Sequence, residues 1–599
     1  MFDGRIYRAA FVPLLLVLVV AGFSLTESPA PLGSTLAPDA FDGARAFAAL
    51  QALVERYPDR APGSVGDDEL ADYIARVLGE PTPGSAGGGF QVSTRRIRAQ
   101  TIDGVRTLTT VIAERPGLTG MSPIAIIAHR DGAARGSAAE LSGTAALLEL
   151  AQVFSQSETR RTIVLVSTSG GSGGYAGAGD FAREDGQRLD AAIVLGDLAG
   201  ALARKPFVLP FSSVSAATPE SLQRTLAAAV SQEVGTDPGA PSVSAQLAQL
   251  AFPLASGEEA PLNAAGVPAV LVQVSGERGP SPEEPVSATR LLNFGRAVLS
   301  ATYALDEGPD VAQGSAGGVL FGHEVLGEWV VRLLTLALLL PALLVGVDAL
   351  ARLRRCNEPL RGGVVWVLTA ALPFFACALF AILLGALGIV AAPGAQLSAR
   401  SLSADASAAP AAGSAALVLV LALLVWPVLV RRLALPLRPS ADGAALAVVL
   451  VLDGVALLVW IFSPVACLLL VPAIHMWLVA IGAGRRPGLR FRALRLCAIL
   501  AGVFPLVLLL VFYGRELGLG ALGLSESVVL AFAGGRIGLF GALLWSVAFG
   551  CLAAVVLLVP TRPAVGAVDP LEWEEISTRG PASYAGPGSL GGTESALRR

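Results

Sequence analysis

Residues 123–150 read PIAIIAHRDGAARGSAAELSGTAALLEL, and this stretch decides the fold. Residues 124–128 form a short apolar run rich in isoleucine, which is typical of a buried strand. His129 and Asp131 follow where that strand should end, and Ser142 begins a run with helical apolar periodicity after a loop of small residues. Open α/β sheets build their sites in the loops that leave the carboxyl ends of strands. The stretch therefore predicts an α/β domain with a site beside His129 and Asp131.

Strand-like and helical segments alternate over residues 40–305. Strands are predicted at residues 107–113, 124–128, 162–167, 192–195 and 269–274, and helices at residues 41–57, 67–78, 142–156 and 219–234. This alternation predicts a largely parallel sheet that is covered by helices on both faces. We therefore expect one three-layer α/β domain over residues 40–305, which is enough chain to bury a full core.

The whole chain is too apolar to be a soluble protein throughout, because 53% of its 599 residues are hydrophobic and only 15% are charged. Apolar runs long enough to span a bilayer are predicted at residues 329–350, 364–391, 412–430, 444–462, 465–481, 494–513 and 537–560. We expect a seven-span membrane domain over residues 329–560. Residues 306–328 would form a juxtamembrane linker, and residues 561–599, which are rich in Gly, Ser and Pro, a disordered tail.

A further apolar run lies near the N-terminus, within residues 1–27. Residues 28–30 are followed by Pro31, which makes a poor cleavage site, so we expect an uncleaved signal-anchor helix. A cleaved signal peptide is the alternative.

The arginines predict the orientation in the membrane. With the N-terminus inside, the short outside loops between the later spans hold only Arg400, Arg515 and Arg536. The inside segments hold Arg5, Arg8, Arg352, Arg354, Arg355, Arg361, Arg431, Arg432, Arg438, Arg485, Arg486, Arg490, Arg492 and Arg495. This asymmetry places the α/β domain outside the cytoplasm and both termini inside it.

Composition also excludes some classes of function. The formal net charge of -4 argues against a nucleic-acid partner. The soluble portion has no cysteine, so it has neither disulfides nor thiolate metal sites. Arginine carries nearly all of the positive charge, and Ala and Gly are abundant. This composition indicates a bacterial genome of high GC content.

The stretch 123–150 resembles the first metal-binding segment of the aminopeptidase-type zinc peptidases (clan MH, which includes the glutamate carboxypeptidase-like enzymes). That segment carries His-x-Asp after a strand and then Asp-Asn-x-Ser-Gly leading into a helix. Later blocks follow in the family's order, so the resemblance covers residues 41–305. It implies a zinc-aminopeptidase-like fold with a mostly parallel mixed sheet. It also implies that His129 is a zinc ligand and that Asp131 orients it through a hydrogen bond.

Several residues that this family uses for catalysis are replaced. Ala139 stands at the position of the carboxylate that bridges the two zinc ions, and Glu140 stands in place of the family's Asn. Gly171 and Ser172, within STSGGSGGYAGAGDF (residues 167–181), occupy the positions of the general base and a Glu ligand. A site without a carboxylate base cannot deprotonate a metal-bound water.

The remaining candidates come from two later blocks. Asp197 matches the family's later Asp ligand, and Glu259 replaces its last His. The full set of vestigial site residues is His129, Asp131, Glu140, Ser172, Asp197, Glu258 and Glu259. Three hypotheses remain for this set: a hydrogen-bonded remnant of a lost site, a single metal held by His129, Asp197 and one of the glutamates, or a working two-zinc hydrolase. We expect no cofactor, although the resemblance implies zinc.

The layout of anchor, exported domain and several spans is similar to that of the peptidase-like subunit of the GPI-anchor transamidase, which implies a non-hydrolytic organiser. We therefore expect a scaffold in contact with membrane lipid that binds an envelope protein partner, a peptide or a lipid-linked ligand. An active membrane-bound zinc aminopeptidase or amidase is the alternative. A transporter-like bundle would need more polar residues in its spans than this sequence has.

Two ionisable residues, Asp453 and His475, lie inside predicted spans, where such side chains are functional candidates by default. The turn at Ser463 and Pro464 joins these spans into a hairpin. Counting residues from this turn places both side chains near the middle of the bilayer. We expect them to form a hydrogen-bonded pair, the alternative being that each has a separate polar contact.

The arginine asymmetry can be tested by labelling. Single cysteines at Ser64 and Ser440, in a background without native cysteine, should react differently with an impermeant thiol reagent. We expect Ser64→Cys to be labelled in intact cells and Ser440→Cys to be labelled only after permeabilisation. Labelling of Ser440→Cys in intact cells would contradict the orientation.

Overall fold

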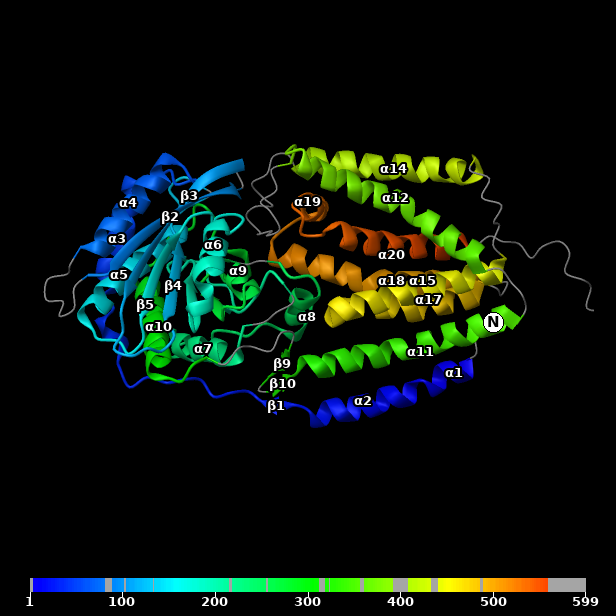
Figure 1. The fold of residues 1–599 in the computed structure, drawn as a ribbon, viewed down its shortest axis with the longest axis horizontal. Coiled ribbons are helices and arrows are strands. Elements are labelled where there is room, and N and C mark those ends of the chain that lie inside the picture. Colours follow the sequence, from blue (N-terminus) through cyan, green and yellow to red (C-terminus); the bar gives the residue numbers. More distant parts are fainter. Residues whose placement is uncertain are drawn as a thin grey trace, which may run out of the picture.

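The structure is a computed structural model. It describes residues 4–80, 89–101, 104–132, 134–214, 218–254, 257–311, 318–322, 324–355, 360–390, 408–432, 440–484 and 488–558. An α/β domain and a bundle of long apolar helices lie end to end (Figure 1). The predicted tail, residues 561–599, lies outside the described residues.

Seven strands form the mixed sheet of the α/β domain, in the order β2-β3-β5-β4-β6-β8-β7. The strands are β2 (Gln91–Thr101), β3 (Gly104–Arg115), β4 (Ile124–His129), β5 (Ile163–Thr168), β6 (Ala191–Leu195), β7 (Val208–Leu209) and β8 (Ala269–Val272). The central strands β5, β4, β6 and β8 are parallel, and β2, β3 and β7 are antiparallel to their neighbours. His129 pairs with Thr168, so β4 and β5 end at the same level.

Helices cover both faces of this sheet. They are α3 (Gly43–Arg56), α4 (Val65–Gly79), α5 (Ala138–Gln156), α6 (Ala176–Asp185), α7 (Glu220–Val234), α9 (Glu259–Ala264) and α10 (Ala288–Glu307), whereas α8 (Val243–Ala251) packs against the helical bundle. Ile124 and Ile126 point to one face, where they pack with α3, α4, α5, α7 and α10. Ala125 and Ile127 point to the other, where they pack with α6 and α9. This alternation follows from the two-residue period of a strand.

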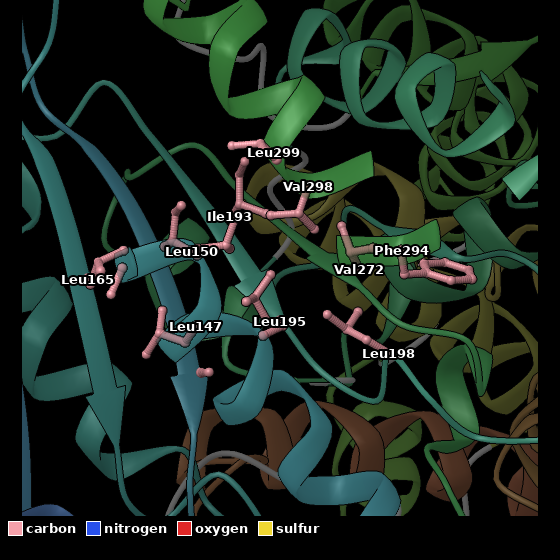
Figure 2. Close-up of a cluster of buried hydrophobic side chains, with 14 of the residues drawn as sticks. Leu147, Leu150, Leu165, Ile193, Leu195, Leu198, Val272, Phe294, Val298 and Leu299 are labelled. Carbon is pink, nitrogen blue, oxygen red and sulfur yellow. The ribbon is translucent and has the colours of Figure 1, made fainter. Parts of the chain in front are cut away.

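The larger core lies between the sheet and α5 and α10. Figure 2 shows Leu147 and Leu150 of α5 and Val298 of α10 meeting strand residues such as Ile193. In Figure 1, α6 and α9 lie on the side of the sheet that faces the bundle. The predicted fold class, a three-layer α/β domain with a mostly parallel mixed sheet, is confirmed.

Eight apolar helical segments within the described ranges are long enough to cross a membrane: Gly4–Phe23, Glu328–Arg355, Leu360–Ala386, Ala409–Leu429, Ala441–Phe462, Pro464–Gly482, Leu489–Glu516 and Leu539–Leu557. They comprise α1 (Gly4–Ala9) with α2 (Phe11–Phe23), α11 (Glu328–Arg355), α12 (Leu360–Ala386), α14 (Ala408–Arg432), α15 (Ala441–Phe462), α16 (Pro464–Cys467) with α17 (Val471–Gly484), α18 (Leu489–Glu516) and α20 (Leu539–Leu557). The N-terminal helix and the seven expected spans are all present. The short apolar helix α19 (Ala521–Ala533) was not expected.

The predicted linker, residues 306–328, contains structure of its own. Its strands β9 (Val319–Phe321) and β10 (Glu324–Leu326) form a small sheet with β1 (Thr26–Glu27). β1 and β10 are antiparallel and pair Thr26 with Val325. Because β1 follows α2 and β10 precedes α11, this sheet brings the two helices into the bundle side by side, where Leu14 and Val17 pack against Ala337.

The domain is joined to the bundle by α8 and the residues that follow it. Phe252 and Leu254 pack among apolar side chains of α18 and α19. Tyr513 of α18 donates a hydrogen bond to the carbonyl oxygen of Phe252 at 2.6 Å, and Arg536 donates to that of Pro253 at 2.8 Å. These bonds satisfy carbonyl groups that the end of α8 leaves free.

Two local predictions were incomplete. The helix α5 begins at Ala138, before the predicted Ser142, so Ala139 and Glu140 lie in its first turn and not in a loop. The edge strand β2 was missed because its sequence, QVSTRRIRAQT, has no apolar run. An edge strand with little burial does not need one.

Candidate functional site

The carboxyl ends of the parallel strands meet at one edge of the sheet and surround a small cavity of about 30 Å³. Its lining includes His129, Glu140, Gly171, Asp197, Glu258 and Glu277. The structure therefore brings together four of the predicted site residues: His129, Glu140, Asp197 and Glu258. Asp131, Ser172 and Glu259 are buried nearby but do not line the cavity.

His129 and Asp131 are held together at the end of β4. His129 Nδ1 lies 3.0 Å from the carbonyl oxygen of Asp131 and 3.7 Å from its Oδ1. Because a carbonyl oxygen only accepts, Nδ1 carries the proton. The hydrogen bond of the imidazole thus goes to the backbone of Asp131 and not to its carboxylate.

The carboxylate of Asp131 also binds the loop after β5. It accepts a hydrogen bond from the backbone N–H of Gly171 at 3.0 Å and another from that of Ser172 at 2.8 Å. Both of its oxygens are used in this way, so the carboxylate holds this loop against the end of β4. Hydrogen bonds to a charged acceptor are the stronger kind in proteins.

Gly171 packs directly against the imidazole of His129. A Cβ atom at position 171 would lie 2.2 Å from His129 Cβ and 2.4 Å from Cγ, which is closer than any real contact. The turn that brings the loop so near contains positive φ angles at Gly170, Gly174 and Tyr175. For Tyr175 this conformation is strained. The loop therefore has no room for a side chain at position 171 in this conformation.

The carboxylate of Asp197 binds backbone N–H groups of the turn that follows it. Its Oδ1 accepts hydrogen bonds from the backbone N–H groups of Ala199 at 3.0 Å and Gly200 at 2.7 Å. Burial raises the pKa of Asp197 to about 6, even though these two bonds favour the charged form. The carboxylate has a structural role in this conformation.

The glutamates around the cavity are buried. Burial raises the pKa of Glu258 to about 8, although Thr168 Oγ1 donates to its Oε1 at 2.6 Å. Burial also raises the pKa of Glu259 well above its ordinary value, and that of Glu277 to about 7. Burial thus favours the protonated form of each of these carboxyl groups.

The residues present do not fit the two-zinc centre of the resembled family. Ala139 supplies no bridging carboxylate, and no side chain has room at position 171. Within the part of the chain that the structure describes, no group of three or more His, Cys, Asp or Glu side chains is arranged to hold a metal ion. This arrangement also gives no support to a single metal shared by His129, Asp197 and a glutamate.

Sequence reasoning missed two buried arginines beside the site. Arg130 Nε lies 2.8 Å from Asp67 Oδ1, and its guanidinium donates to the carbonyl oxygens of Ser167 and Thr109. Arg60 donates to the carbonyl oxygen of Arg130 at 3.2 Å. The only sequence signal was the position of Arg130 inside the His-x-Asp motif. These arginines fix the ends of β4 and β5 and the start of α4.

Arg60 also ties the turn before α4 to the start of α5. Its Nη1 donates to the carbonyl oxygen of Tyr57 at 3.0 Å, and its Nη2 donates to that of Ser137 at 2.8 Å. Burial lowers the pKa of Arg60, and the nearby carboxylate of Glu140 opposes this shift. The first turn of α5, which carries Ala139 and Glu140, is therefore fixed beside the cavity.

The prediction of a hydrogen bond between Asp453 and His475 is wrong. His475 Nε2 donates to the carbonyl oxygen of Leu338 at 2.8 Å, and Tyr7 lies 2.8 Å from Nδ1. Both ring nitrogens are therefore used by other partners. Asp453 lies instead against α11, where a Cβ added to Gly346 would be 3.0 Å from its Oδ2. The alternative, a separate polar contact for each side chain, describes His475, whereas Asp453 Oδ2 has no hydrogen-bond partner among the described residues.

Comparison with known proteins supports the resemblance. Residues 110–270 match the family model of peptidase family M28, whereas no curated protein matches the chain. This match lies within the α/β domain, and the predicted likeness to the aminopeptidase-type zinc peptidases is confirmed. The similarity to the GPI-anchor transamidase subunit stays a prediction.

Several solved structures are similar to the chain. The aminopeptidase from Aneurinibacillus sp. strain AM-1 has 12% identity and a TM-score of 0.34, over 46% of this chain and 97% of that one. A Bacteroides thetaiotaomicron glutaminyl cyclase bound to N-acetylhistamine has 16% identity and a TM-score of 0.33, over 44% and 98%. The LapA aminopeptidase of Legionella pneumophila has 13% identity and a TM-score of 0.34, over 45% and 74%.

The packing of Gly171 on His129 predicts that even a methyl group will not be accommodated. Gly171→Ala should lower the free energy of unfolding of the domain by about 1–3 kcal/mol, the usual cost of overpacking a core. Hydrogen–deuterium exchange of peptides from β4 and β5 in the full chain measures this.

Gly179→Ala in α6 is the matched control. Its Cβ would lie 3.7 Å from Pro261 Cβ, an ordinary contact, so stability should not fall. Equal protection from exchange in the wild type and Gly171→Ala would show that the loop does not rest on His129.

Proposed function

We propose that this chain is a membrane protein whose domain of the M28 peptidase type binds a partner without hydrolysing it. One observation carries the proposal: the loop that should carry the catalytic acids instead lies on His129 and is held there by the carboxylate of Asp131. The chain thus keeps the frame of the peptidase and closes its site.

The size of the cavity supports loss of hydrolysis. A single water molecule needs roughly 10–15 Å³ of cavity volume. The cavity of about 30 Å³ therefore has room for very few water molecules. It cannot admit a peptide bond together with an attacking water in this conformation. Glu258, which lines it, is a neutral acid near pH 7 because burial raises its pKa to about 8.

The proposed place of action is the outer surface of a bacterial cytoplasmic membrane. The last turn of α11 carries Arg352, Arg354 and Arg355. In Figure 1 this end of α11 and the N-terminus lie at the end of the bundle that is remote from the α/β domain. Arginine at that end supports a cytoplasmic N-terminus and an exported domain.

The N-terminal helix is proposed to be an uncleaved signal anchor. Tyr7 contacts His475, α2 packs on α11, and β1 extends the sheet of β9 and β10. Cleavage at residues 28–30 would remove all three of these contacts, because α1, α2 and β1 all precede it. A chain that keeps its anchor as part of the bundle suits a scaffold, because the exported domain is then held at a fixed height above the membrane.

Metal content and turnover test the proposal. The full chain, purified in detergent and incubated with zinc, should retain less than one zinc per chain by elemental analysis. It should hydrolyse no aminoacyl or peptide amide substrate faster than a His129→Ala control. Two zinc ions per chain, with turnover that His129→Ala abolishes, would establish the alternative of an active zinc aminopeptidase or amidase.

A further inference from the structure

A second and larger cavity, of about 110 Å³, lies where the α/β domain meets the bundle. Phe211, Thr218 and Pro219, from the connection between β7 and α7, form the wall on the domain side. Leu250 of α8, with strands β9 and β10, forms the wall on the membrane side. A cavity of this size holds a small apolar group such as a ring or the end of an aliphatic chain.

The position of its outer wall relates this cavity to the membrane surface. Leu320 and Val325 line the cavity from β9 and β10, and Gly327 alone separates β10 from α11. Exposed aromatic side chains lie beside them, with Phe321 45% and Trp329 57% exposed. Aromatic residues at the ends of spans mark the level of the lipid head groups. The outer wall is therefore at the depth where lipid head groups meet acyl chains.

The polar groups of the lining limit the chemistry of a ligand. Among the described residues that line the cavity, Glu220 is the one charged residue, and none of them is an arginine or lysine that could bind a phosphate. Glu220 Oε1 is buried and has no hydrogen-bond partner in the described structure. A buried carboxylate oxygen without a partner favours a ligand that brings N–H or O–H donors. An ammonium group satisfies both the charge and the hydrogen bond.

The lining also argues against an extended peptide. A peptide would bind here most simply by adding a strand to the free edge of β9. The side chain of Gln246 already occupies that edge: its Oε1 accepts from Leu320 N–H at 2.7 Å, and its Nε2 donates to the Leu320 carbonyl oxygen at 3.1 Å. The edge thus offers no free backbone pair at Leu320.

We propose that this junction cavity, lined by Phe211, Glu220, Leu250 and Val325, is a binding site for an amine-bearing membrane lipid. Part of the acyl chain occupies the apolar cavity, and the ammonium group of the head binds the carboxylate of Glu220. This inference does not depend on whether the site at His129 is active, because the two cavities have no lining residue in common.

Native mass spectrometry of the full chain tests the proposal. The chain is reconstituted in nanodiscs that hold equal amounts of phosphatidylethanolamine, phosphatidylcholine and phosphatidylglycerol with identical acyl chains, and is then released into detergent. The wild type should retain phosphatidylethanolamine about tenfold better than the other two, since a charge-assisted hydrogen bond is worth that much. Phosphatidylcholine has the charge but no N–H donor, and phosphatidylglycerol has donors but no cation.

Two variants locate the site. Glu220→Gln should remove the preference for phosphatidylethanolamine, and Val325→Trp should reduce retention of every lipid by obstructing the cavity. Glu233→Gln on the same helix, which does not line the cavity, is the matched control and should behave as the wild type. Equal thermal stability of the variants shows that they are folded.

Three outcomes would overturn the proposal. They are equal retention of the three lipids by the wild type, retention that neither Glu220→Gln nor Val325→Trp changes, and copurification of a peptide in place of lipid.

Discussion

The two hydrogen bonds from the loop after β5 to the carboxylate of Asp131 determine the state of the candidate site. They hold Gly171 against His129, so no side chain can be accommodated at position 171. The close approach requires glycine at position 171 and positive φ angles at Gly170, Gly174 and Tyr175. Glycine at position 171 thus permits a packing on His129 that any larger residue would prevent.

Closure of the loop explains the unusual electrostatics of this edge of the sheet. Glu258 and Glu259 are 1% and 0% exposed, and only Glu258 has a good hydrogen-bond donor among the described residues, namely Thr168. Burial favours the protonated forms of both. Arg130 and Asp67 are also buried, and they are in contact with each other. Unpaired carboxylates would be far more costly to bury than these neutral acids.

The sequence predicted the frame of the molecule well and its contacts poorly. The run of Ile124 to Ala128 and the alternation of strands and helices were sufficient for the fold, because burial of a parallel strand imposes a pattern on its residues. The substitutions at Ala139 and Gly171 also showed that the catalytic set was incomplete. However, neither the packing of Gly171 on His129 nor the partners of His475 could be predicted, because they are tertiary contacts. Tyr7 and His475 are 468 positions apart, and no local pattern relates them.

The central claim is that burial holds the acids around His129 in their protonated forms, and the pH dependence of stability tests it most directly. A buried acid with a raised pKa keeps its proton when folded, so its contribution to stability is present at low pH and is lost as pH rises toward the folded pKa. With pKa values of about 8 for Glu258 and about 7 for Glu277, protection of β4 to β8 from hydrogen exchange should fall between about pH 5 and pH 8. Protection is measured in the full chain, corrected for the intrinsic rate of exchange, with zinc and with a chelator. The account predicts that protection declines with pH to the same extent with zinc and with the chelator. Protection that increases with pH when zinc is present would contradict it, because metal binding requires deprotonated ligands.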